Sequence, residues 1–247
     1  MDDAHLPPLR PFAGPRQKEG SLGGYAVLAG QTDGTGAVSR PVSPITIPEA
    51  TMEAFQETVR RFFKDLWPAE EKILVFGEGQ THQPPLMLIG EAPGEQETLQ
   101  HRPFVGKAGK NLDAFLQAVS LRREDIYISN VVKIRPTKVS PRGSISNRPP
   151  NREELALFTP FLYDEIRLVS PRLLVTLGNV ALQAILGRDA VIGACHGRPH
   201  TADLQGTALT VFPLYHPASV IYNRSLLATY EADLQALRAH LDAGNVI

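Results

Sequence analysis

Cysteine is almost absent from this chain, which has Cys195 alone among 247 residues. One thiol excludes a disulfide within the chain, and it excludes any metal or iron-sulfur site built from cysteines alone. The sequence also lacks an apolar run long enough to cross a membrane, and its N-terminus lacks the basic start and hydrophobic centre of a signal peptide. These absences predict a cytoplasmic protein with no membrane contact.

Net charge is also nearly absent, with 25 Lys and Arg against 26 Asp and Glu, which argues against a uniformly basic nucleic-acid binder. The distribution is uneven. Residues 101–152 contain eleven Lys or Arg and three acids, a net of +8, and the formal charge of −1 for the whole chain leaves −9 for the rest. A polyanionic partner on one face is one interpretation, and a solvated basic loop is the other.

Composition divides the chain near residue 47. Residues 1–46 are rich in Pro, Gly, Ser and Thr and bury too little apolar surface to offset their ordering entropy, which predicts a poorly ordered or loosely docked tail. Residues 47–247 alternate strand and helix patterns and predict a single domain. A short strand is expected at 73–76. The main strands are expected at 86–89, 126–132, 173–177 and 208–214, separated by amphipathic helices. This order predicts an α/β fold, a three-layer α/β/α sandwich with a central, mostly parallel four-stranded sheet.

The stretch 86–106 is the most informative part of the sequence. Its apolar residues 86–89 run straight into Gly90, and two further turn residues within the next four positions forbid the strand from continuing. Three of the expected strand ends present polar residues: Glu91 follows 86–89, Asn130 ends the IYISN part of 126–132, and His216 follows 208–214. Because parallel strands place their carboxyl ends on one edge of a sheet, we expect these three side chains to share one crevice.

Four motifs, in this order, resemble the uracil-DNA glycosylase superfamily, specifically its family 4. They are GEAPGEQE at 90–97, RPFVGKAG at 102–109, SNVVK at 129–133 and YHPAS at 215–219. The resemblance extends from about residue 73 to the C-terminus. It implies a DNA-repair enzyme that flips uracil out of DNA and hydrolyses its N-glycosidic bond, leaving an abasic site. The implied partner is uracil-containing DNA, bound by a protein that we expect to be a monomer.

The resemblance also implies a uracil-binding set of Gly90, Glu97, Phe104 and Asn130. The family places an aromatic ring under the flipped base, which falls on Phe104. Its asparagine falls on Asn130, whose amide offers a donor for uracil O4 and an acceptor for N3–H. Glu97 corresponds to the position that crowds the uracil 5-carbon and so disfavours thymine.

The catalytic residues implied are Glu91 and His216. His216 would donate to uracil O2 as negative charge develops on the leaving base. Glu91 would position water or stabilise the cation-like sugar. The third residue of that motif is Ala92, where related families carry a water-activating group, so the identity of that group stays open.

DNA contacts are expected from two segments. The residues after His216 resemble the loop that enters the minor groove, and the basic stretch 135–150 suits phosphate contacts. The predicted DNA-binding set is Lys133, Arg135, Lys138, Arg142, Pro217, Ser219, Tyr222 and Arg224.

Two departures from the family matter. Family 4 carries four cysteines for an iron-sulfur cluster, and their positions fall here on Ile134, Phe158 and two residues within 62–67. We therefore predict no iron-sulfur cluster, no metal and no other cofactor, with apolar packing in place of the cluster. The loop 135–150 has the length found in an atypical branch that binds DNA covalently through a histidine. Asn147 occupies that position here, so no covalent adduct is expected.

Two alternatives stay open. One is a binding module that holds uracil-containing or single-stranded DNA through the same pocket and hydrolyses slowly or not at all. The other is a nucleotide-binding protein that uses GEAPG as a phosphate loop, although this motif lacks the usual glycine spacing and carries acids where phosphate would lie.

Overall fold

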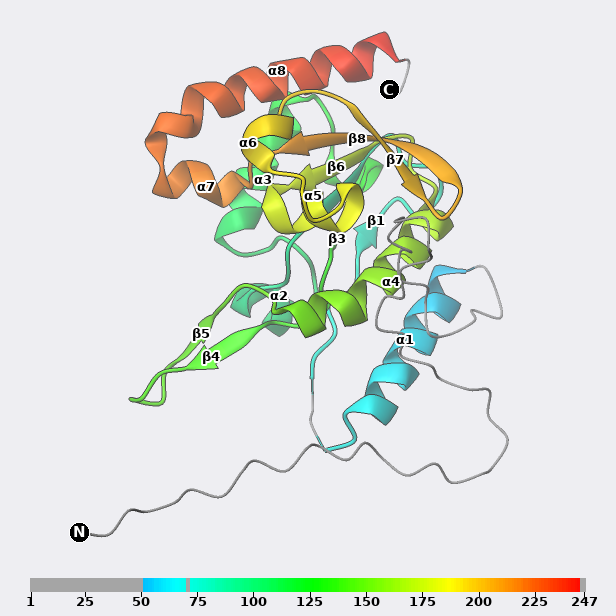
Figure 1. The fold of residues 1–247 in the computed structure, drawn as a ribbon, viewed down its shortest axis with the longest axis vertical. Coiled ribbons are helices and arrows are strands. Elements are labelled where there is room, and N and C mark those ends of the chain that lie inside the picture. The colour runs from blue at the N-terminus through cyan, green and yellow to red at the C-terminus, as the bar shows by residue number, and fades with distance from the viewer. Residues whose placement is uncertain (1–50, 70–71, 245–247) are drawn as a thin grey trace, which may run out of the picture.

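The computed structural model describes residues 51–69 and 72–244, so the tail predicted at 1–46 lies outside the described residues. A six-stranded sheet in the order β1-β3-β2-β6-β8-β7 forms its centre (Figure 1). Four parallel strands occupy the middle: β3 (Tyr127–Asn130), β2 (Met87–Gly90), β6 (Leu174–Leu177) and β8 (Thr207–Leu214). The edges β1 (Glu78–Gly79) and β7 (His200–Leu204) are antiparallel to their neighbours. The prediction of a four-stranded sheet is therefore wrong, because the sheet is six-stranded and mixed.

Both faces of the sheet are covered by helices, because alternate residues of each central strand point to opposite sides. Met87 and Ile89 pack with α1 (Met52–Leu66), α4 (Arg152–Val169) and α5 (Gly178–Leu186). Leu86 and Leu88 pack with α3 (Lys107–Ala118) and α8 (Leu227–Ala243). The shorter helices are α2 (Glu95–Gln100), α6 (Ile192–Cys195), α7 (Pro217–Tyr222) and the two 3-10 turns η1 (Arg123–Asp125) and η2 (Arg224–Leu226).

Two of the long helices, α1 and α4, begin where the sequence supplies capping side chains. Thr51 precedes α1, and its hydroxyl oxygen accepts a hydrogen bond from the Ala54 N–H at 3.2 Å. Asn151 precedes α4 and accepts from the Glu154 N–H at 2.8 Å, while the Glu154 carboxylate accepts from the Asn151 N–H at 2.8 Å. This reciprocal capping satisfies amide groups that the first helical turn leaves without partners. None of the helices among the described residues is long and apolar enough to cross a membrane.

Two local expectations need correction. Residues 73–76 form no strand, although the Val75 N–H donates to the Lys133 carbonyl at 2.7 Å, and the first strand begins at Glu78. The stretch expected as a long basic loop contains a β-hairpin of β4 (Thr137–Val139) and β5 (Ile145–Asn147). This hairpin projects from the body of the molecule (Figure 1).

Candidate active site

Four of the predicted pocket residues meet at the carboxyl ends of the parallel strands. Gly90 ends β2 and lies in register with Asn130, which ends β3. A Cβ atom added to Gly90 would overlap Asn130 Oδ1 and would lie 2.5 Å from Cζ of Phe104. His216 lies two residues after the end of β8, and its ring lies 6.1 Å from the Phe104 ring at an angle of 23°. Glycine is therefore required at position 90 for the ring and the amide to approach each other.

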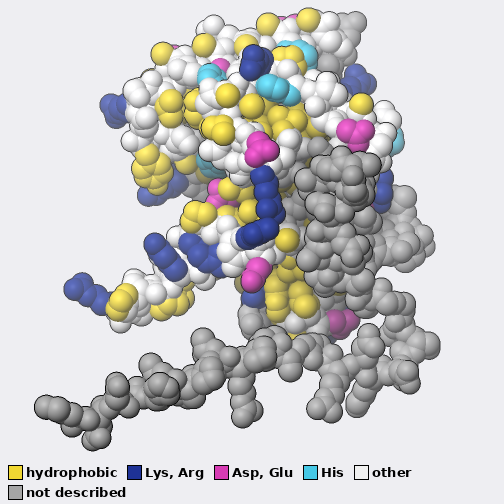
Figure 2. All heavy atoms as spheres, viewed as in Figure 1, with side chains coloured by type: hydrophobic (Ala, Val, Ile, Leu, Met, Phe, Trp, Pro, Cys, Tyr) yellow, Lys and Arg dark blue, Asp and Glu magenta, His cyan; other side chains and the backbone are white. Residues whose placement is uncertain are grey.

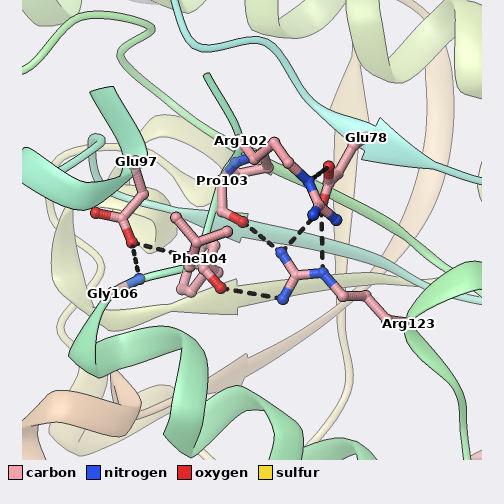
Figure 3. Close-up of polar contacts among 8 residues, drawn as sticks. Glu78, Glu97, Arg102, Pro103, Phe104, Gly106 and Arg123 are labelled. Carbon is pink, nitrogen blue, oxygen red and sulfur yellow. Dashed lines mark hydrogen bonds and ion pairs between the residues drawn. The ribbon is translucent and has the colours of Figure 1, made fainter. Parts of the chain in front are cut away.

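Phe104 lies in a turn with an unusual backbone. Its φ of 53° is in the left-handed region, which costs a non-glycine residue roughly 1–3 kcal/mol. The Glu97 carboxylate holds the following residues, since Oε1 accepts from the N–H groups of Val105 at 2.9 Å and Gly106 at 2.6 Å (Figure 3). Its other oxygen accepts from the Gly94 N–H at 3.1 Å. Glu97 is thus a buried carboxylate that orders the turn, a contact that no pattern in the sequence indicated.

The Lys133 side chain is not accessible to DNA. Its side chain is fully buried, and its ammonium group lies 2.5 Å from Oε2 of Glu165 on α4. The same ammonium donates to the backbone carbonyl of Asn130 at 2.7 Å and to Ser129 Oγ at 2.6 Å. The prediction that Lys133 contacts DNA is therefore wrong. It is bound beneath the strand end that presents Asn130.

Glu165 is the acidic partner that the sequence interpretation missed. Besides Lys133, it accepts hydrogen bonds from the hydroxyls of Tyr127 at 3.0 Å and Ser129 at 2.9 Å. Burial and the nearby Glu165 charge raise the pKa of Tyr127, so its hydroxyl stays protonated and donates. A signal was present, because Glu165 lies at helical spacing with Phe158 and Leu162, on the buried side of α4. A charged residue on an apolar face requires a buried partner.

Burial shifts the pKa of each candidate catalytic residue toward its neutral form. Burial lowers the pKa of His216, which keeps the ring neutral near pH 7. Its Nδ1 accepts a hydrogen bond from the Ala218 N–H at 3.2 Å, so the proton of the neutral ring is on Nε2. Burial raises the pKa of Glu91, which follows Gly90 at the end of β2. The site thus combines a neutral N–H donor with a partly desolvated carboxyl group.

Comparison with known proteins agrees with this geometry. The family model of the uracil DNA glycosylase superfamily matches residues 76–241. The chain belongs to the uracil-DNA glycosylase superfamily. Curated relatives include the Type-4 uracil-DNA glycosylase of Saccharolobus solfataricus, which is 33% identical over 198 residues that cover 78% of this chain and 87% of that protein. The Type-4 enzyme of Thermotoga maritima is 36% identical over 178 residues, covering 72% of this chain and 86% of its own.

Two further proteins also match. The Type-5 uracil-DNA glycosylase of Pyrobaculum aerophilum is 32% identical over 178 residues, covering 64% of this chain and 72% of that protein. The crystal structure of wild-type SMUG2 from Pedobacter heparinus has a TM-score of 0.45 and 14% identity, covering 84% of this chain and 93% of that one. The family assignment rests on the sequence matches.

The segment after His216, which is expected to enter the minor groove, is helical. Pro217–Tyr222 form α7, with Pro217 at its first turn. Pro217 is buried and lines a cavity of about 370 Å³ between α3, α7 and α8, and its contact with DNA stays a prediction. Ser219 is half-buried, whereas Tyr222 is 86% exposed and Arg224 is exposed.

The basic residues of the β4–β5 hairpin have different surroundings. Arg135, at its base, is held by Oδ1 of Asn147 at 2.7 Å and by Glu95 at 3.3 Å. Lys138 and Arg142 are exposed, and neither forms an ion pair within the described part of the chain. Figure 2 shows Lys and Arg side chains along this projection. It therefore presents free cations away from the body of the molecule.

The positions that the family resemblance assigns to the cluster cysteines hold apolar side chains that pack together. Ile134 and Phe158 are 5% and 0% exposed, and both belong to the core on the α4 face. The Phe63 ring stacks on Phe158 at 4.6 Å and on Trp67 at 4.8 Å. An iron-sulfur cluster requires several thiolates, and the only cysteine, Cys195, lies in α6. The residues present do not fit a cluster, and among the described residues no group of three or more His, Cys, Asp or Glu could hold a metal ion.

Proposed function

We propose that this protein is a monofunctional uracil-DNA glycosylase, related to family 4, that acts without an iron-sulfur cluster. The observation that carries the proposal is the convergence of Phe104, Asn130 and His216 at one end of the parallel sheet. An aromatic face, an amide and a neutral imidazole are the groups needed to hold a flipped pyrimidine and to stabilise it as it leaves. Helices on both faces of the sheet support the three-layer arrangement implied by the family resemblance.

Base recognition follows from the donors and acceptors that the pocket offers. The Asn130 amide donates to uracil O4 and accepts from N3–H, whereas cytosine presents the opposite pattern and leaves buried polar groups without partners. The Phe104 ring stacks under the base. Glu97 is ordered by three backbone N–H groups next to this ring, which supports its role in crowding the 5-methyl group of thymine.

In the reaction, the bond between the sugar C1′ and uracil N1 breaks, and its electron pair leaves with the base. The Nε2–H of neutral His216 donates to uracil O2, where negative charge develops, without having to give up its proton. Glu91, as a carboxylate, stabilises the cation-like sugar or orients the water that adds to C1′. The proton that the water loses ends on the departing uracil anion, so the products are free uracil and an abasic site.

DNA is held by the two exposed segments that flank the pocket. Lys138 and Arg142 on the β4–β5 hairpin contact phosphates, and Arg135 anchors the hairpin base. At α7, Ser219 lies near the DNA backbone, and Tyr222 or Arg224 fills the gap that the flipped base leaves in the duplex. We propose that the protein does this as a cytoplasmic monomer associated with the nucleoid.

Single-turnover cleavage of labelled oligonucleotides carrying one uracil, cytosine or thymine tests the proposal. The wild type is expected to release uracil alone, and Asn130→Asp is expected to weaken the discrimination against cytosine. EDTA is expected to leave the rate unchanged, so activity lost with chelator and restored by metal would overturn the metal-free mechanism. Uracil-dependent gel retardation without cleavage would instead support the alternative, a binding module that holds uracil-containing DNA.

A further inference from the structure

Arg123 connects the turn that carries Phe104 to the edge of the sheet. It lies at the start of η1, and its guanidinium Nη1 donates to the Phe104 carbonyl at 3.0 Å while Nη2 donates to the Pro103 carbonyl. On its other side, Nε and Nη2 donate to Oε1 of Glu78 at 3.1 and 3.0 Å (Figure 3). One planar side chain thus binds two consecutive carbonyls and a carboxylate, a geometry that a lysine cannot reproduce.

Glu78 is itself fixed from a second direction. Arg102, two residues before Phe104, donates from Nε to Oε2 of Glu78 at 2.7 Å and from Nη2 to Oε1 at 3.1 Å. Burial acts to raise the pKa of Glu78, but the hydrogen bonds from Arg102 and Arg123 outweigh it and the pKa is lowered. Glu78 lies on β1, in register with Ile128 of β3, so the carboxylate is anchored to the sheet. The N-terminal side of the Phe104 turn is therefore tied to Glu78 twice, through Arg102 and through Arg123.

The turn needs such ties because its backbone conformation is unfavourable. Phe104 has a φ of 53°, and its ring must still reach Gly90 at the end of β2. Arg123 binds the carbonyls of residues 103 and 104, while Glu97 binds the N–H groups of residues 105 and 106. A Cβ atom on Gly109 would overlap the Phe104 carbonyl, so the first turn of α3 closes the remaining side. Peptide groups before and after the strained residue are thus all engaged.

We propose that Arg123 and Glu78 are positioning residues that hold Phe104 in the conformation that stacks on the substrate base. The stacking part of this proposal rests on the proposed function, whereas the hold on the turn does not. The hydrogen bonds of Arg123 and Glu78 go to each other, to Arg102 and to the turn backbone, so both act through Phe104. Removing either is expected to let the turn relax toward ordinary φ values and displace the ring.

Single-turnover cleavage at saturating uracil-DNA, with matched variants, tests the effect on chemistry. Arg123→Met keeps the length of the side chain and removes the guanidinium, and it is expected to slow base release about tenfold to hundredfold, the usual cost of misplacing a contact by an ångström. Glu78→Gln is expected to act in the same direction, and Arg123→Lys is expected to restore little. Arg122→Met is the control, because Arg122 is exposed and pairs with Glu124 and Asp125. Affinity for uracil-free duplex is expected to stay unchanged, and an equal loss of affinity would overturn the proposal.

Combination with Phe104→Ala shows whether Arg123 acts through the ring. If it does, Arg123→Met slows the Phe104→Ala enzyme by no more than about twofold, because the two changes remove the same contribution. A full further loss on that background would mean that Arg123 acts elsewhere and would overturn the proposal.

Amide hydrogen exchange provides a readout that needs no activity. Arg123→Met and Glu78→Gln are expected to speed exchange at the Val105 and Gly106 N–H groups and to leave the amides of α4 unchanged. Unchanged exchange at Val105 and Gly106 would overturn the positioning role. If the wild type releases no uracil, the proposed function fails, and this exchange measurement still decides the role of Arg123. If Arg123→Met does not fold, Glu78→Gln carries the test.

Discussion

Two ion pairs lie behind the pocket, and they differ in their access to water. Both side chains of Lys133 and Glu165 are 0% exposed, whereas those of Glu78 and Arg123 are each 25% exposed. Each pair sends a cationic donor to the backbone carbonyl of a pocket residue, Asn130 in the first case and Phe104 in the second. Similar hydrogen bonds therefore support Asn130 and Phe104, but one comes from a pair shielded from water and the other from a pair that water reaches.

The difference teaches what each pair does. When a fully buried charge loses its partner, no water can take the partner's place. The stability of the fold therefore depends on the pair of Lys133 and Glu165. Breaking a partly exposed pair lowers the free energy of unfolding only a little, since water substitutes for the missing partner. Its remaining contribution is geometric. We therefore expect the buried pair to affect folding and the edge pair to affect the position of a ring.

The largest expected effect is at the buried pair. Lys133→Met leaves Glu165 charged and without its cation, and we expect it to lower the free energy of unfolding by about 3–5 kcal/mol. Equilibrium unfolding in urea measures this, with Arg122→Met as a surface control that is expected to leave the midpoint unchanged. Adding Glu165→Gln to Lys133→Met removes the buried charge and keeps an acceptor for the hydroxyls of Tyr127 and Ser129, so it is expected to recover much of the loss. A loss below about 1 kcal/mol in the single variant would remove the contrast between the pairs.

A smaller effect, on rate alone, is expected at the pocket residue His216. His216→Ala removes the donor to uracil O2 and is expected to slow cleavage by about a hundredfold to a thousandfold while changing DNA affinity much less. In the wild type, the lowered pKa of His216 keeps the ring neutral, so the rate is expected to stay flat above the ordinary histidine pKa of 6.5 and to fall only below it. Equal losses of rate and affinity in His216→Ala would contradict the transition-state role.

At the edge pair the expected stability change is small and depends on pH. Because the folded pKa of Glu78 is lowered, its contribution is present above the ordinary value of 4.5 and is lost as the pH falls through the folded pKa. Glu78→Gln is expected to cost about 1 kcal/mol or less at neutral pH. Urea unfolding of both proteins from pH 7 into the acid range measures the difference, which is expected to shrink. A difference that grows in acid would contradict the assignment.

The smallest effect is expected at the exposed hairpin, which supports neither wall of the pocket. Arg142→Ala is expected to reduce the slope of log affinity against log salt concentration by about 0.9, the value for one lost phosphate contact. Fluorescence anisotropy titrations at several salt concentrations measure this slope. The preference for uracil is expected to stay unchanged, and an altered preference would place the hairpin in the pocket.

The sequence predicted the central strands because continuous apolar runs mark buried parallel strands, and it placed Glu91, Asn130 and His216 at their ends. It did not predict the edge strands, since β1 has two residues and β7 buries only Ala202 and Leu204. Lys133 was misassigned because a basic stretch suggests a surface, whereas its partner Glu165 comes from a distant helix. The contact between Glu78 and Arg123, 45 residues apart, leaves no local pattern.

Single-turnover release of uracil by the wild type and by Asn130→Ala, side by side in EDTA, tests the central claim most directly. The account predicts abasic-site formation by the wild type and its loss in Asn130→Ala, with the two proteins equally stable in urea. Equal rates in the two proteins would contradict it, because the strand-end pocket would then not be where uracil is read.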